Sequence, residues 1–209
     1  MSFSISAYDA AVDAPRAHHA IYDYDSGPPV DRGKFAIWLF LATEVMFFSG
    51  LIGTYIVLRM GTSAWPNPED RLAVGITAVN TFILICSSWT MVRALHAIQG
   101  EDRRGLVKWL GATIVIGSVF VGVQVYEYGQ LIEHEMLPNV DIFWSTFYAM
   151  TGFHGLHVVV GVVWLTCLWA GAVRGRYSRA SHLRIELGGL YWHFVDLVWV
   201  LLFTIVYLM

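Results

Sequence analysis

The sequence predicts an all-α integral membrane protein, a bundle of five transmembrane helices. Of its 209 residues, 56% are hydrophobic and only 14% are charged, and the mean hydropathy is +0.56. A soluble globular domain has about 25% charged residues, so this composition is typical of a chain that spans a bilayer. The net charge of −3, without any basic cluster, leads us to expect no nucleic-acid partner.

Five apolar segments are long enough to cross a membrane, because about 20 helical residues span a hydrocarbon core of about 30 Å. The connectors are short and rich in turn-forming residues, which predicts a single bundle. The expected spans are residues 34–60, 72–98, 106–132, 142–173 and 183–208. Residues 1–33 lack hydrophobic periodicity and are interpreted as a flexible cytoplasmic tail, ahead of a five-helix membrane domain over residues 34–209.

The positions of lysine and arginine predict the orientation. Only Arg59 and Arg71 fall on one side of the expected bundle, whereas the other 11 of the 13 basic residues fall in or beside the tail and the second and fourth connectors. Basic residues accumulate in cytoplasmic loops. We therefore expect the N-terminus in the cytoplasm and the C-terminus outside.

Eight polar side chains lie within the expected spans, where a charge at the helix centre costs about 2.5–3.5 kcal/mol and so suggests a function. At about 1.5 Å per residue, four of them fall near the middle of the membrane and Glu127 falls near its outer side. The eight residues are Glu44, Asn80, Gln124, Glu127, His154, His157, His193 and Asp196.

The two histidines at positions 154 and 157 share one helix face and allow three interpretations. Their spacing could chelate a metal ion, although no Glu-x-x-His pair on two helices supports such a site. One of them could bind haem together with His193, although the residues around His193 are bulky. The third interpretation is a pair of neutral histidines hydrogen-bonded between helices.

Glycines within the expected spans predict close helix packing, which membrane bundles need in the absence of a hydrophobic force between helices. They are Gly50, Gly53, Gly111, Gly117, Gly122, Gly152, Gly155, Gly161, Gly188 and Gly189.

Four segments resemble subunit III of the haem-copper terminal oxidases, the cytochrome c oxidase subunit III family. They are KFAIWLFLATEVMFFSG (34–50), GVQVYEYGQLI (122–132), FYAMTGFHGLHVVVGVVWL (147–165) and ELGGLYWHFVDLVWVLLFTIVYL (186–208). The resemblance covers residues 34–209 in the family's order. With five spans rather than seven, the chain is similar to the short bacterial form, which lacks two helices that help to build the lipid cleft of the long form.

The resemblance implies a subunit without catalytic residues and without its own haem, copper or other metal. Such a subunit packs against subunit I, beside subunit II and small subunits, and the partner subunits carry the haem and copper. It holds structural phospholipid and supports proton uptake and durability during turnover. The complex is expected in the bacterial cell (inner) membrane, as part of aerobic electron transport or a respiratory supercomplex.

The resemblance also suggests roles for single residues. Glu44 matches the intramembrane glutamate of the family's ATEVMFF motif, which is associated with carbodiimide reactivity. Proton-uptake support or inter-helix bonding is expected for Glu44, Gln124, Glu127, His154, His157, His193 and Asp196. Contacts with lipid head groups are expected for Arg174, Arg176 and Arg184.

Two alternatives within this family and one outside it remain. The chain could be subunit III of a quinol oxidase, or the related accessory protein of a nitric oxide reductase. Outside the family, it could be a small haem-binding membrane electron carrier.

Overall fold

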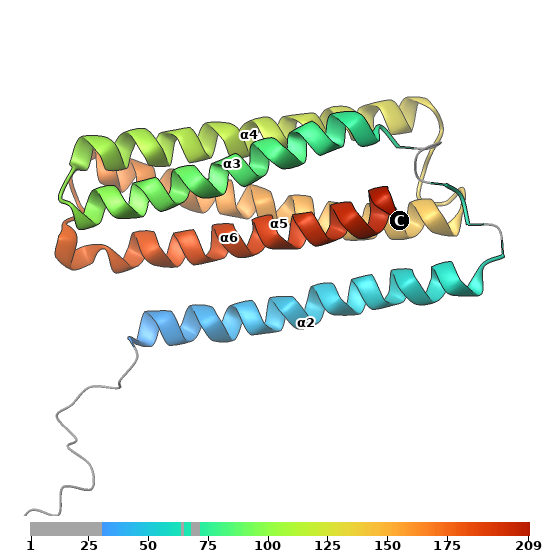
Figure 1. Ribbon diagram of the computed structural model, residues 1–209, viewed down its shortest axis with the longest axis horizontal. Helices are drawn as coiled ribbons and strands as arrows, with labels where there is room; N and C mark the ends of the chain where they lie inside the picture. Colours follow the sequence, from blue (N-terminus) through green and yellow to red (C-terminus); the bar gives the residue numbers. More distant parts are fainter. Residues whose placement is uncertain (1–30, 64, 68–71) are drawn as a thin grey trace, which may run out of the picture. The chain divides into compact units, whose positions relative to one another are not determined.

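The computed structural model describes residues 31–63, 65–67 and 72–209. Residues 1–30 of the expected tail lie outside the described residues. Residues Gly33–Met209 form one unit. Its helices are α2 (Arg32–Gly61), α3 (Val74–Gln99), α4 (Arg103–Glu133), α5 (Ile142–Val173) and α6 (Leu183–Phe203), with a 3₁₀ turn, η2 (Arg179–Ser181), before α6 and a π-helical turn, η3 (Thr204–Leu208), after it (Figure 1).

These elements confirm the five predicted spans. Each span is long and apolar enough to cross a bilayer, and the described residues contain no strand. Helix α4 begins three residues before the predicted span, because the Asp102 carboxylate caps it by accepting a hydrogen bond from the Gly105 N–H at 2.9 Å. Asp141 caps α5 in the same way, with 2.9 Å to the Trp144 nitrogen. Both carboxylates satisfy first-turn N–H groups that have no partner within the helix.

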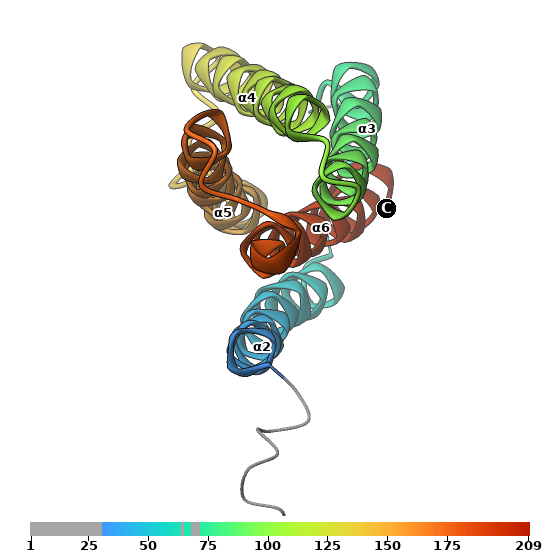
Figure 2. The same cartoon turned by 90° about the vertical axis from the view of Figure 1, so that its left-hand side faces the viewer.

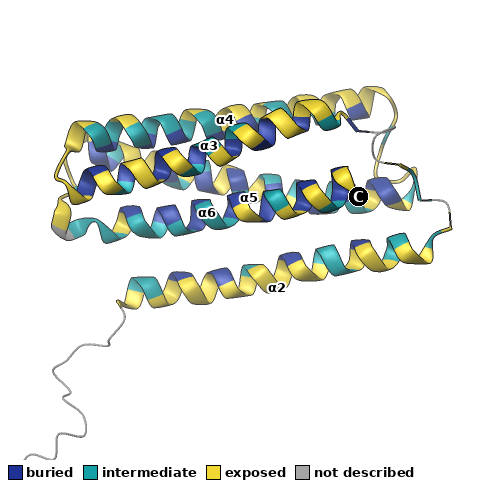
Figure 3. Ribbon diagram, in the orientation of Figure 1, coloured by how far each residue is buried: buried dark blue, intermediate teal, exposed yellow. Residues whose placement is uncertain are grey.

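Helices α3, α4, α5 and α6 form a closed ring, in which α3 and α5 each pack against both α4 and α6 (Figure 2). Helix α2 lies outside this ring and reaches it through side chains, such as Phe48 against His154 of α5 and Phe194 of α6. Of the five helices, α6 is the most buried and α2 the most exposed (Figure 3). The four helices of the ring supply the buried polar side chains, and α3 contributes the most of them.

Indole groups of α6 align this helix with α3. The Trp192 indole N–H donates to Ser87 Oγ at 2.9 Å, and the Trp199 indole N–H donates to Thr81 Oγ1 at 2.8 Å. All four side chains are buried. Interhelical bonds of this kind contribute about 0.6–2 kcal/mol each in a membrane, and two of them along one interface set the register of the two helices.

The glycines divide into two groups, which corrects the expectation that all of them permit close packing. Gly117 of α4 and Gly161 of α5 both lie against the buried Trp192 ring. A Cβ would fall 2.5 Å from a ring carbon at Gly117 and 3.0 Å from one at Gly161. Gly50, Gly53 and Gly122 instead have no atom within 4 Å of the place where a Cβ would stand. A Cβ at Gly155 or Gly188 would likewise fall within 3.0 Å of a side chain on another helix, so the expectation is wrong only for the glycines that have open space beside them.

Three helices end in the same Schellman motif, but only one of them uses glycine at the left-handed position. Gly175 has φ of +70° after α5, whereas Glu101 after α3 and Glu135 after α4 both have φ of +58°. At the end of α4 the Glu135 N–H bonds to the Ile132 carbonyl and the Met136 N–H to that of Leu131. A side chain is disfavoured at such a φ because its Cβ approaches the following carbonyl oxygen.

Replacing Glu135 by glycine should therefore raise the free energy of unfolding by up to about 1 kcal/mol, since glycine adopts this conformation without a Cβ penalty. Glu135 is exposed, so the substitution removes no buried contact. Thermal unfolding of the detergent-solubilised chain measures the change. The matched variant Gly175→Ala should lower the stability, and an equal response of both positions would contradict the explanation.

Candidate functional site

Glu44 of α2 and His157 of α5 form a polar pair between two helices. Glu44 Oε2 lies 3.0 Å from His157 Nε2, and the side chains are 16% and 18% exposed. Phe47 and Phe48 of α2 lie against the imidazole ring, with centroid distances of 6.2 Å and 5.1 Å. The pair is thus a polar contact set among aromatic side chains, and α2 also meets α6 through the ion pair between Lys34 and Glu186 at 2.7 Å.

Hydrogen-bond geometry limits the protonation of this pair. His157 Nδ1 lies 2.7 Å from the Phe153 carbonyl oxygen, which can only accept, so Nδ1 must carry a hydrogen. The Nε2 contact with Glu44 then needs one hydrogen, carried either by the carboxyl group or by the ring. In both arrangements the pair has no net charge and contains one proton that can pass between the two residues.

His154 has a different environment, although it is only three residues away. Its side chain is fully buried, and neither ring nitrogen has a hydrogen-bond partner among the described residues. The imidazole stacks on Trp199 with a centroid distance of 5.0 Å and an interplanar angle of 28°, and Phe120 contacts it edge-on. The interpretation that both histidines are hydrogen-bonded between helices is therefore wrong for His154.

A second cluster joins α3 to α6. Ser88 Oγ donates to Asp196 Oδ2 at 2.5 Å and lies 3.0 Å from His193 Nδ1. Since a hydroxyl group has one hydrogen, the bond to Asp196 makes His193 Nδ1 the donor to Ser88. Asp196 is buried, and its Oδ1 has no partner among the described residues.

The third cluster surrounds Glu127 of α4. Its carboxylate accepts hydrogen bonds from Thr77 of α3 at 3.3 Å and from Tyr207 of η3 at 3.2 Å and 3.3 Å. The π-helical turn thus carries a tyrosine that reaches a half-buried acid on another helix, and π-turns often accompany functional positions.

Gln124, one turn before Glu127, belongs to a separate group. Its amide donates to the Thr151 carbonyl at 2.9 Å, and the Thr151 hydroxyl lies 2.7 Å from that of Tyr128. Asn80 donates to the Phe120 carbonyl at 3.3 Å. The polar residues expected in the spans therefore form several separate clusters rather than one continuous set.

Sequence reasoning did not single out five residues that complete these clusters, namely Thr77, Ser88, Tyr128, Thr151 and Tyr207. A signal for Thr77 was present in α3, where buried hydroxyl and amide side chains recur along one face at positions 77, 80, 81, 87 and 90. No comparable pattern marks Tyr207, because its contact with Glu127 depends on the final turn being π-helical.

The metal and haem interpretations find no geometric support. The described part of the chain contains no group of three His, Cys, Asp or Glu side chains close enough to hold one ion. A haem bound by two histidines would need His193 and a histidine of α5 to face a common pocket. Instead, His193 bonds to Ser88 and His157 to Glu44, while the His154 ring lies against Trp199.

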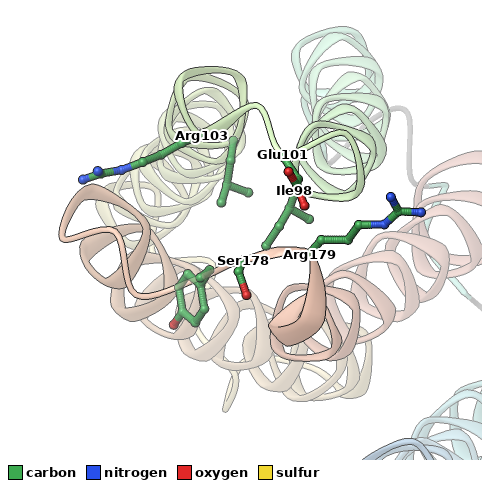
Figure 4. Close-up of a pocket in the computed structure, with 7 residues that line it drawn as sticks. Ile98, Glu101, Arg103, Ser178 and Arg179 are labelled. Atoms are coloured by element: carbon green, nitrogen blue, oxygen red, sulfur yellow. The ribbon is translucent and has the colours of Figure 1, made fainter.

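A pocket of about 290 Å³ lies where the α3–α4 and α5–α6 connections meet. Figure 4 shows that Arg103 and Arg179 extend away from it in different directions, so their cations do not converge on one ligand. The Arg103 guanidinium instead donates to the Ala172 and Val173 carbonyls at the end of α5. The three arginines expected to contact lipid, Arg174, Arg176 and Arg184, are exposed.

The fold and the polar clusters together define a multi-pass helical membrane protein, whose helices are joined by buried and half-buried polar side chains. The sequence family described as cytochrome c oxidase subunit III matches residues 17–209, and the chain belongs to this family. It is therefore a subunit of a haem-copper oxidase complex, an oxidoreductase assembly with further subunits.

Similar proteins include both cytochrome c and quinol oxidase subunits. The chain is 44% identical to cytochrome c oxidase subunit 3 of Synechocystis sp. over 182 residues, 86% of this chain and 76% of the relative. It is 39% identical to cytochrome c oxidase subunit 3 of Thermostichus vulcanus, over 86% and 88% of the two chains. The quinol oxidase subunit 3 of Bacillus subtilis is 33% identical over 82% and 84%.

Proposed function

We propose that the chain is the accessory subunit III of a proton-translocating cytochrome c oxidase, packed against subunit I in a bacterial cell membrane. The haem and copper belong to the partner subunits, and this chain supports proton uptake and durability during turnover. The higher identities to relatives named cytochrome c oxidase, 44% and 39% against 33% for the quinol oxidase relative, favour this type. The proposal keeps residues 1–33 as a cytoplasmic tail and 34–209 as the membrane domain.

The Glu44–His157 pair is the observation that carries the proposed role in proton uptake. It holds one transferable proton without net charge, at a site that is mostly shielded from solvent. A neutral pair avoids the cost of an isolated charge within the membrane. It can therefore remain in place throughout turnover and still exchange a proton with a neighbouring donor.

An apolar groove between α2 and α6 supports the proposal of bound phospholipid. It has a volume of about 570 Å³ and is lined by Trp38, Leu41, Ala42, Val45, Leu190, His193, Phe194 and Leu197. These side chains suit an acyl chain, and the exposed Arg174, Arg176 and Arg184 remain the candidates for head-group contacts. A partner subunit would form the open side of the groove.

Purification of the full chain with its partners tests the assignment. Haem together with a CuA centre in the co-purified complex supports a cytochrome c oxidase. Haem without CuA would show a quinol oxidase, which the Bacillus subtilis relative makes the second candidate. A partner with non-haem iron would show the accessory protein of a nitric oxide reductase, and a haem b spectrum from the isolated chain that disappears in His157→Ala would contradict the accessory role.

Substituting Glu44 by alanine should leave the initial rate of oxygen reduction largely intact, since the redox centres are in other subunits. The variant leaves His157 Nε2 without its partner and removes the shared proton, so we expect slower proton uptake or earlier inactivation during turnover. Stopped-flow proton uptake and the number of turnovers before inactivation measure this effect. Glu133→Gln, an exposed acid on α4, is the control. Unchanged pumping and unchanged durability in Glu44→Ala would rule out a functional role for Glu44.

A further inference from the structure

A hollow lies between α3 and α4, at the end of the bundle where α3 begins and α4 ends. We call it the head pocket; it has a volume of about 300 Å³, near the lower limit of pockets that bind small molecules. Its walls are mostly apolar, and Glu127 is its one acidic residue. The lining residues are Ala73, Ile76, Val123, Tyr126, Glu127, Gln130, Leu131, His134 and Met136.

Glu127 in this pocket has hydrogen-bond donors but no cation. Thr77 and Tyr207 donate to its carboxylate from inside the bundle. Among the described residues, no ion pair joins Glu127 to a lysine, arginine or histidine. An acidic group against apolar walls is expensive to keep charged, and a cation supplied from outside would offset that cost. Tyr126 also lines the pocket and is an aromatic residue of the kind that attracts ammonium groups.

A second hollow continues from the head pocket along α3. We call it the trough; its volume is about 280 Å³, and its lining residues are Gly75, Ile76, Val79, Asn80, Ile83 and Val123. Ile76 and Val123 line both hollows, so the two adjoin. From Gly75 to Ile83 the trough extends about 12 Å along the helix, at 1.5 Å per residue. The Asn80 amide donates to the Phe120 carbonyl inside the bundle, which leaves an almost wholly apolar surface.

We propose that the head pocket and the trough together bind an amphiphilic amine, with its protonated nitrogen against Glu127 and its apolar chain in the trough. Because Ile76 and Val123 line both hollows, the nitrogen of the ligand must be attached directly to its apolar chain. A phospholipid places its phosphate between the amine and the chains, and this would bring a second anion beside Glu127. The ligand class is therefore an alkylammonium compound, and the site is independent of which oxidase the chain belongs to.

Photolabelling of the whole oxidase complex in lipid nanodiscs tests the site. The probes are dodecylamine, dodecanol and dodecyl phosphate, each with a diazirine on the chain, and mass spectrometry maps the labelled peptides. We expect the amine to label the segments around Val79 and Val123 saturably, at least about tenfold more than either other probe, which corresponds to about 1.4 kcal/mol. Equal labelling by the amine and the alcohol, or stronger labelling by the phosphate, would overturn the proposal.

Two variants separate the contribution of the ligand's ammonium group from that of its apolar chain. Glu127→Gln keeps the size of the side chain and should lower amine labelling to the level of dodecanol, whereas Glu133→Gln, at the end of the same helix, should leave it unchanged. Val79→Trp fills the trough from an exposed position and leaves Glu127 in place, so it should also abolish labelling by the amine. If the Glu127→Gln chain does not assemble into the oxidase complex, the Val79→Trp variant alone tests the site. Full labelling by the amine in either variant that assembles would contradict the proposal.

Discussion

Replacing Gly117 by alanine should lower the free energy of unfolding by about 2–3 kcal/mol, in the range measured for overpacked cores. The new Cβ would lie 2.5 Å and 2.8 Å from two carbons of the Trp192 ring and 3.3 Å from Val162. Movement of Trp192 is restricted, because Gly161 also lies against its ring and its indole N–H is hydrogen-bonded to Ser87. The strain must therefore either separate α4 from α6 or break the Trp192–Ser87 hydrogen bond, which aligns α6 with α3.

Gly122→Ala is the matched control for this prediction. It lies on the same helix, and no atom is within 4 Å of the place where its Cβ would stand. Alanine favours helix over glycine by up to about 1 kcal/mol, so this variant should be neutral or slightly more stable. Thermal unfolding in detergent, followed by tryptophan fluorescence, compares the two. Equal losses at both positions would show that glycine is required for a reason other than the Trp192 contact.

Replacing His154 by leucine should raise the stability of the chain, an unusual result for a fully buried residue. Both ring nitrogens lack a partner among the described residues, and an unpaired buried polar group costs about 1–3 kcal/mol. Loss of the aromatic contact with Trp199 costs about 0.5–1.5 kcal/mol. The gain from removing the unpaired imidazole is larger than the loss of the aromatic contact. We therefore expect the free energy of unfolding to rise by about 1 kcal/mol.

His157→Leu should have the opposite sign. It removes the partner of Glu44 and leaves an acid unpaired between apolar helices, at a cost of about 2 kcal/mol. The same unfolding measurement is used for both variants. A loss of stability in His154→Leu would mean that a bound water or ligand satisfies the imidazole in the native protein, and a neutral His157→Leu would mean that the Glu44 contact contributes no stability.

The sequence predicted the fold more completely than the site. The span over residues 142–173 agrees with α5 at both ends, and the span over 183–208 agrees with α6 and η3 together. Hydropathy and helix length were sufficient because the membrane requires about 20 apolar residues from every span, whatever its neighbours are. The start of α4 differed by three residues because a local cap, Asp102, sets it.

The site depends on contacts that no sequence pattern describes. His154 and His157 share a helix face, yet three residues correspond to a rotation of about 60° around the helix axis. This rotation points His157 toward Glu44 of α2 and His154 toward Trp199 of α6. The glycines show the same limitation, because a Cβ at Gly117 would meet Trp192 whereas a Cβ at Gly122 would have no atom within 4 Å.

The sequence by itself determined the class of protein, the five spans and the family to which the chain belongs. These follow from properties of single residues summed along the chain, such as hydropathy, and from motifs within continuous segments. Only the tertiary structure decided which polar groups meet. Glu44 and His157 are 113 positions apart, and Ser88 and Asp196 are 108 apart, so their pairing follows from the packing of α2, α3, α5 and α6.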